Sequence, residues 1–163
     1  MKAGDLLIYP TESSYALGCI FNDRAGIKKI MQLKGRSDPR FTVVASSVEQ
    51  IQKYFKLSPA MLALGKQYWP GALSIVVGKR YAVRVPGLAS ARQAAELAGA
   101  PLIATSLNVS GEPPVFDLKQ LPVRFHGISI IDGGVLQPKA PSTVVECFRG
   151  GYVVHRLGAV NIQ

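Results

Sequence analysis

The sequence is poor in the residues that usually carry nucleophilic or metal chemistry. Its 163 residues include only two histidines, His126 and His155, and two cysteines, Cys19 and Cys147. They show no zinc-ligand spacing, and two histidines leave little room for a serine or cysteine triad. Both cysteines lie in apolar surroundings and form no pair motif. We expect reduced core thiols here, not a disulfide or a metal site.

Several familiar motifs and targeting signals are also missing. Neither Gly-x-x-x-x-Gly-Lys-Ser/Thr nor Gly-x-Gly-x-x-Gly occurs, so any nucleotide must be held by dispersed side chains. No apolar run approaches the roughly 20 residues of a membrane span. Met1–Asp5 leads almost directly into an apolar segment, which argues against a signal peptide. We therefore expect a cytoplasmic protein that does not contact a membrane.

Acidic residues are scarce relative to basic ones. Ten Asp and Glu stand against 19 Lys and Arg, which gives a formal net charge of +9, and the pI is about 9.8. Such a charge attracts polyanions, so ATP, pyrophosphate and RNA are natural partners. A generally basic soluble protein is the alternative interpretation of the same composition.

The hydrophobic pattern predicts one α/β domain over residues 1–163, built on a mixed sheet flanked by helices. Asp23, Ser47 and Ser58 are the expected N-caps of the first three helices. The expected helices are 24–34, 48–54, 59–68, 89–98 and a short one near 117–121. The expected strands are 6–9, 41–45, 73–77, 81–85, 102–105, 128–131, 143–147 and 152–156.

Four segments far apart in the chain combine cations, hydroxyl groups and turns. They are Tyr9–Gly18, Lys34–Arg36, Ser106–Gly111 and Pro141–Val145. Cations and hydroxyl donors beside turns and strand ends are what a triphosphate and an amino acid require. Together, these segments predict a nucleotide-handling cleft.

Most residues of these segments also have a purely structural interpretation. Lys34 and Arg36 end a helix, where a cation complements the negative end of the helix dipole. Ser106 and Asn108 follow a strand but also suit a simple turn. Arg84 is different, because an arginine in a half-buried apolar strand usually has an anionic partner.

In their order along the chain, these residues resemble the YrdC/TsaC-type threonylcarbamoyl-adenylate synthases. The resemblance spans nearly the whole chain, and its length is similar to that of the short, single-domain branch of the family. It is carried by Tyr9-Pro10-Thr11-Glu12, Lys34-x-Arg36, Trp69-Pro70-Gly71, Val83-Arg84-Val85, Ser106-x-Asn108-x-Ser110-Gly111, Pro141-Ser142-Thr143-Val144-Val145 and Arg156-x-Gly158-Ala159.

The resemblance implies a concave, basic cleft and a specific reaction. Members of the family combine L-threonine, bicarbonate and ATP, which carries Mg²⁺, into threonylcarbamoyl-adenylate and pyrophosphate. Partner transferase proteins then pass the threonylcarbamoyl group to an adenosine of tRNA. Direct binding of tRNA or double-stranded RNA would use the same basic face.

The resemblance also implies site roles. Thr11 would hold threonine, and Arg84 would pair with its carboxylate. Lys34 and Arg36 would be the catalytic cations, acting on the carbamate and on the phosphates. Four further residues would contact the phosphates of ATP: Ser106, Asn108, Ser142 and Arg156.

Some positions depart from the family pattern. Gly78-Lys79-Arg80 is a very short link where many relatives have a longer excursion over the cleft, and the loop after Arg36 is altered. A non-catalytic YciO-like paralog and an RNA-binding module that uses the same basic face are therefore the alternative hypotheses. The paralogs replace the asparagine of the Ser-x-Asn motif, whereas this chain keeps Asn108, which favours the synthase.

Overall fold

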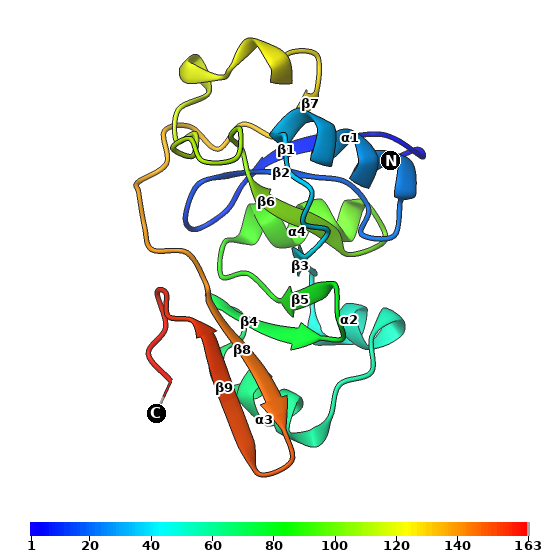
Figure 1. The fold of residues 1–163 in the computed structure, drawn as a ribbon, viewed down its shortest axis with the longest axis vertical. Coiled ribbons are helices and arrows are strands. Elements are labelled where there is room, and N and C mark those ends of the chain that lie inside the picture. The colour runs from blue at the N-terminus through cyan, green and yellow to red at the C-terminus, as the bar shows by residue number, and fades with distance from the viewer. Residues whose placement is uncertain (163) are drawn as a thin grey trace.

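One mixed β-sheet runs the length of the molecule in the computed structural model, which describes residues 1–162. In this part of the chain nine strands lie in the order β7-β1-β2-β6-β3-β5-β4-β8-β9 (Figure 1). The strands are β1 (Leu7–Pro10), β2 (Tyr15–Gly18), β3 (Phe41–Val44), β4 (Leu73–Val77), β5 (Tyr81–Arg84), β6 (Leu102–Ser106), β7 (Ser129–Ile130), β8 (Thr143–Phe148) and β9 (Gly151–Arg156).

Four α-helices flank the sheet, and their N-caps are those that the sequence predicts where a side-chain cap exists. They are α1 (Arg24–Lys34), α2 (Val48–Tyr54), α3 (Pro59–Tyr68) and α4 (Ala89–Leu97). The side chains of Asp23, Ser47 and Ser58 accept hydrogen bonds from backbone N–H groups in the first turns of α1, α2 and α3. Helix α1 ends at Gly35, whose φ of 63° is in the left-handed region that favours glycine.

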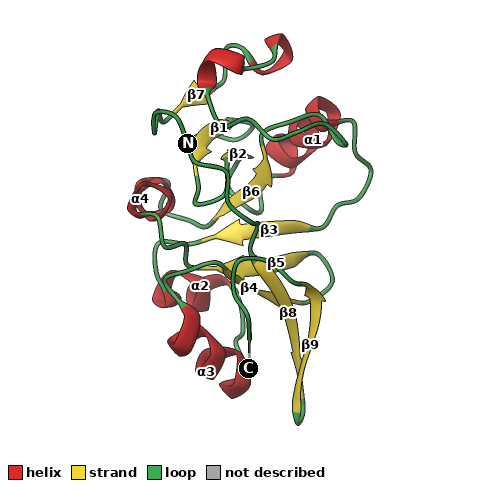
Figure 2. Ribbon diagram, turned by 90° about the vertical axis from the view of Figure 1, so that its left-hand side faces the viewer, coloured by secondary structure: helices red, strands yellow, loops and turns green. Residues whose placement is uncertain are grey.

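The two faces of the sheet pack against different helices and belong to two separate core clusters. Successive side chains of a strand point to opposite faces. Val43 accordingly belongs to the larger core cluster, with Ile30 of α1 and Ile51 of α2. Val44 belongs to a smaller cluster with Ala91 and the other buried alanines of α4. Figure 2 shows α1 and α4 on opposite sides of the upper sheet. Because α4 covers only part of its face, the remainder of that face is left open.

Two elements were not predicted from the sequence. The prediction omitted β2, which pairs with β1 and β6, and the 3-10 helix η2 (Val123–Phe125). The short helix expected near 117–121 is present as the 3-10 helix η1 (Leu118–Gln120). The ends of the other strands lie within one residue of the expected ones, and β4 matches at both ends. Within residues 1–162, none of the helices is long and apolar enough to cross a membrane.

Candidate ligand-binding cleft

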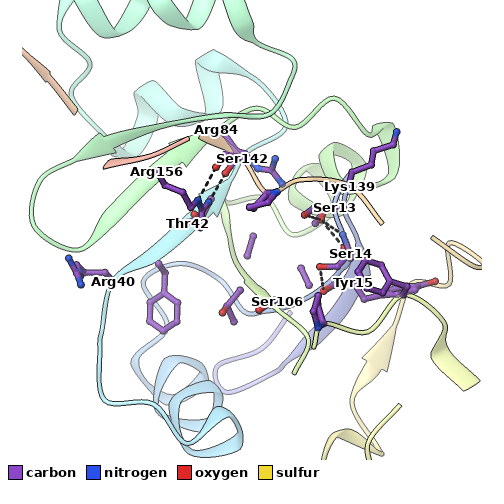
Figure 3. Close-up of a pocket in the computed structure, with 18 of the residues that line it drawn as sticks. Ser13, Ser14, Tyr15, Arg40, Thr42, Arg84, Ser106, Lys139, Ser142 and Arg156 are labelled. Carbon is purple, nitrogen blue, oxygen red and sulfur yellow. Dashed lines mark hydrogen bonds between the residues drawn. The ribbon is translucent and has the colours of Figure 1, made fainter. Parts of the chain in front are cut away.

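A cavity of about 490 Å³ lies on the open part of the sheet face that α4 leaves uncovered (Figure 3). Ala16, Thr42 and Ala104 are among its lining residues, each on a different central strand. These side chains point to the same face as Val44 and Leu102, which pack under α4. Since they are small, they leave room for a ligand directly on the sheet.

Cations line this cavity from several elements. They come from the loop after α1 (Arg36 and Arg40), from β5 (Arg84), from the segment before β8 (Lys139) and from β9 (Arg156). Among the described lining residues there is no aspartate or glutamate. Five positive groups around one cavity predict an anionic ligand.

Hydroxyl-bearing and aromatic side chains line the rest of the cavity. The hydroxyl-bearing residues are Thr11, Ser13, Ser14, Thr42, Thr105, Ser106 and Ser142, and the rings are those of Tyr15, Phe41 and Phe116. The Arg36 guanidinium lies 4.8 Å from the centre of the Phe41 ring and donates a hydrogen bond to the Arg40 carbonyl. These contacts hold the loop that carries both arginines.

Arg84 has the anionic partner that its sequence context predicts. It is 5% exposed, and its Nη2 lies 3.2 Å from Oε2 of Glu12. Its Nε has no hydrogen-bond partner within residues 1–162, although the side chain is buried. Glu12 follows β1, so this ion pair joins two strands that are not neighbours in the sheet.

Arg156 and Ser142 form a second polar corner of the cavity. Arg156 donates to the Ser142 carbonyl at 3.0 Å and to Oγ of Ser142 at 3.1 Å. Oγ of Ser142 also lies 2.8 Å from Oγ of the buried Ser74. Burial and, after it, repulsion by Arg84 lower the pKa of Arg156. The positive charges of Arg84 and Arg156 therefore act on each other at this cavity.

Lys34 is placed behind the cleft and does not line it in the described structure. It is 3% exposed, and its Nζ donates to the carbonyls of Ser106 (2.5 Å) and Asn108 (2.9 Å) and to Oδ1 of Asn108 (2.7 Å). Burial and, to a lesser extent, Arg36 lower its pKa to about 8. All three ammonium protons therefore act on the turn after β6, and none is left for a ligand.

The turn after β6 is held from several sides. Ser106 donates to Oδ1 of Asn108 at 2.7 Å, and the Asn108 amide donates to the Glu112 carbonyl. Ser106 lines the cavity, whereas Asn108 does not. Lys34 and Asn108 thus form a support that presents Ser106 to the cleft.

Thr11 contacts the cavity while its hydroxyl is bonded within its own turn. Its Oγ1 donates to the Ser14 carbonyl at 2.7 Å, and its backbone N–H donates to the same oxygen. Oγ of Ser13 lies 3.4 Å from Oγ1 of Thr11. Ser13 and Ser14 also line the cavity (Figure 3).

Of the eight residues singled out from the sequence, six line the cavity: Thr11, Arg36, Arg84, Ser106, Ser142 and Arg156. Sequence reasoning missed Arg40, Lys139, Ser13, Ser14 and Thr42. Lys139 lies two residues before the Pro141-Ser142 motif and Ser13 lies two residues after Thr11, so proximity to a motif was an available signal. No sequence signal marked Thr42, because it is a single polar residue within an apolar strand and lies in none of the motifs.

The described residues give little support to a metal site or to a cysteine nucleophile. They contain no group of three or more His, Cys, Asp or Glu that could hold a metal ion. Cys19 and Cys147 are free, as predicted, and burial raises the pKa of the Cys19 thiol to about 12. A thiolate nucleophile is therefore disfavoured at Cys19.

Comparison with known proteins agrees with this geometry. The family model for Sua5, YciO and YrdC proteins, described as "Telomere recombination", matches residues 1–158. A curated protein of Pyrococcus abyssi named threonylcarbamoyl-AMP synthase is 31% identical over the whole chain, which spans 53% of that relative's length. A protein of the same name from Neisseria gonorrhoeae is 29% identical, with 90% of this chain and 86% of the relative aligned.

Solved structures show the same likeness in three dimensions. The chain superposes on P. abyssi Sua5 in complex with L-threonine with a TM-score of 0.84 and 32% identity, over 95% of this chain and 51% of that one. E. coli YciO gives a TM-score of 0.83 and 27% identity, over 97% of this chain and 85% of that one. The chain therefore belongs to the Sua5/YciO/YrdC family.

Proposed function

We propose that this protein is an L-threonylcarbamoyladenylate synthase, a nucleotidyltransferase that forms threonylcarbamoyl-AMP and pyrophosphate from L-threonine, bicarbonate and ATP. The observation that carries the proposal is the cavity with five cations, lined by no carboxylate within residues 1–162. The names of the relatives in P. abyssi and N. gonorrhoeae support it. They favour the synthase over the non-catalytic alternatives.

The reaction needs positioned charge more than a protein nucleophile. The amino group of threonine attacks bicarbonate and forms a carbamate with loss of one water molecule. A carbamate oxygen then attacks the α-phosphate in line with the departing pyrophosphate. Both the carbamate and the triphosphate are anions, so their approach requires charge neutralisation and a fixed orientation. Arg36, Arg40, Lys139 and Arg156 provide positive charge around the cavity.

The remaining roles follow from position. Arg84, paired with Glu12, is the group we assign to the threonine carboxylate, and Thr11, which also lines the cavity, is assigned to hold threonine. Ser106 and Ser142 are assigned to contacts with the phosphates of ATP, while Lys34 and Asn108 hold Ser106 in place. Mg²⁺ enters with ATP as part of the substrate, bound chiefly by phosphate oxygens.

The product serves tRNA modification in this proposal. Partner transferases would carry the threonylcarbamoyl group to an adenosine of tRNA in the cytoplasm. Direct contact of tRNA or double-stranded RNA with the basic face would place the formation of threonylcarbamoyl-AMP close to the tRNA that receives the threonylcarbamoyl group.

The decisive experiment measures pyrophosphate release from Mg-ATP with threonine and bicarbonate, and with each omitted in turn. The synthase releases pyrophosphate only when both are present. Release without threonine would indicate an unspecific ATPase, and no release under any condition would favour the YciO-like or RNA-binding alternative.

Arg84→Lys separates the enzyme from an RNA-binding module. Lysine keeps the charge but loses the planar fork that pairs with a carboxylate. The synthase therefore shows a threonine KM raised by roughly tenfold or more, with tRNA affinity nearly unchanged. A phosphate contact to RNA depends mainly on charge, so unchanged threonine dependence would contradict the assignment.

A further inference from the structure

Glu12 is a carboxylate beside a strongly basic cleft. Its Oε1 accepts a hydrogen bond from the backbone N–H of Gly87, and its Oε2 forms an ion pair with Nη2 of Arg84 at 3.2 Å. This pair is not a hydrogen bond, because Oε2 has no hydrogen-bond partner in the described structure. The Glu12 side chain is 20% exposed, and it is not among the residues that line the cavity. Glu12 therefore acts on the cleft through Arg84.

The backbone of Gly87 is itself fixed from the other side. Arg92, on the first part of α4, donates from Nη1 to the carbonyls of Pro86 and Gly87, at 2.7 Å in each case. Gly87 then holds Glu12, and Glu12 holds Arg84. This series ties the orientation of the guanidinium to α4, the helix that covers the neighbouring part of the same sheet face.

Arg84 carries its charge on a wall of the cavity and keeps one donor unused. Burial and, after it, repulsion by Arg84 lower the pKa of Arg156, and both arginines line the cavity. Nε of Arg84 has no partner in the described structure, although the residue is 5% exposed. A buried donor of this kind on a cavity wall is suited to an incoming acceptor.

From these contacts we infer that Glu12 is a positioning residue: it holds the Arg84 guanidinium in the orientation that receives the carboxylate of the amino-acid substrate. The inference rests on the proposed function for the identity of that substrate. The contact between Glu12 and Arg84 does not depend on it.

Glu12→Gln tests the inference with the smallest change in shape. Its amide oxygen can still accept from Gly87, but the negative charge facing Arg84 is lost. We expect the threonine KM to rise by roughly tenfold, kcat to stay within about threefold and the KM for ATP to stay within about twofold. A thermal melt shows whether the variant is folded, and Glu96→Gln, on the exposed side of α4, is the matched control.

A double-mutant cycle distinguishes positioning from an independent effect. If Glu12 acts through Arg84, Glu12→Gln adds little to the rise in threonine KM already caused by Arg84→Lys. Additive effects in the cycle would contradict the inference. An unchanged or lowered threonine KM in active Glu12→Gln would do the same.

A second measurement does not require activity. The ¹⁵Nε–¹Hε NMR signal of Arg84, assigned by its loss in Arg84→Lys, should shift and exchange faster with solvent in Glu12→Gln but not in Glu96→Gln. If wild-type protein releases no pyrophosphate, the proposed function fails while this signal still tests the contact. An unchanged signal in Glu12→Gln would show that Glu12 does not hold Arg84.

Discussion

At the scale of single residues, burial separates groups that contact a ligand from groups that hold them. Lys34 and Arg36 stand two positions apart, and both were assigned to the ligand from the sequence. Arg36 lines the cavity, whereas Lys34 is 3% exposed and gives all of its donors to the turn after β6. Lys34 ends α1, as the sequence predicts, but its side chain is buried there, and its assignment as a catalytic cation stays a prediction.

Lys34→Met should destabilise the protein. The change removes the Lys34 donor from the carbonyls of Ser106 and Asn108 in a partly buried place, and it leaves Oδ1 of Asn108 with only the hydrogen bond from Ser106. Orphaned groups of this kind cost about 2–4 kcal/mol of unfolding free energy in total, measured by urea denaturation. Lys28→Met, an exposed change on the same helix, is the control and should shift stability by less than about 0.5 kcal/mol. Equal effects of the two changes would show that the Lys34 contacts contribute nothing.

The lowered pKa of Lys34 also predicts a pH dependence. Its pKa is about 8 in the folded protein against 10.5 without the fold, so between pH 8 and pH 10.5 the unfolded chain binds more protons here. Stability contributed by this side chain therefore rises with pH across that window and is lowest below pH 8. The difference in unfolding free energy between wild type and Lys34→Met should grow with pH, on the order of 1 kcal/mol per unit. A difference that stays flat from pH 7 to pH 10 would contradict the pKa shift.

At the scale of elements, local signals predicted helices better than strands. Asp23, Ser47 and Ser58 mark helix starts, because a cap acts on residues two or three positions away. Strand β2 was missed because its four residues are all buried, so it shows no alternation of polar and apolar positions. Its place is set by pairing with β6, which lies about 90 residues further along the chain.

The segment before β8 is held by the chain that follows β9. Oγ1 of Thr143 accepts from the backbone N–H groups of Gly158 and Val160, at 2.9 and 3.2 Å. The N–H of Ala159 donates to the Pro141 carbonyl at 2.9 Å. This clamp fixes Ser142 beside Arg156, so the late Ser-Thr-Val motif owes its position to the end of the described chain.

Gly158→Ala should disturb this clamp, because a Cβ there would lie 2.1 Å from the Pro141 oxygen and 2.7 Å from the Ser142 carbonyl carbon. The contact is with backbone, which must move and carry Ser142 with it. We expect Mg-ATP affinity to fall by roughly tenfold in calorimetry, with a small decrease in Tm. Gly151→Ala, on β9, meets only the Phe148 ring at 3.4 Å and serves as the control. Unchanged affinity in Gly158→Ala would show that the position of Ser142 does not matter for the nucleotide.

At the scale of the whole molecule, the strand order brings the sequence motifs together. Strands β2, β6, β3 and β5 are neighbours in the sheet, although they span residues 15 to 106. Their shared open face collects residues from Thr11 to Arg156 around one cavity. The sequence predicted that these motifs meet, from their order and chemistry. It could not predict that Glu12 meets Arg84, because that contact depends on how the sheet is assembled.

Five cations gather around the cleft, and this predicts how ligand binding affects stability. Arg84 and Arg156 repel each other, and no carboxylate lines the cavity within the described residues. Mg-ATP at about 100 times its Kd should add about 2.7 kcal/mol of unfolding free energy, which is a rise of roughly 5–10 °C in Tm. The rise should weaken as KCl increases from 50 to 300 mM, because salt screens the attraction. Arg156→Gln should reduce it, whereas Arg149→Gln, an exposed change in the β8–β9 turn, should not. If both variants weakened the effect equally, the affinity for ATP would be a property of the general +9 charge and not of this cleft.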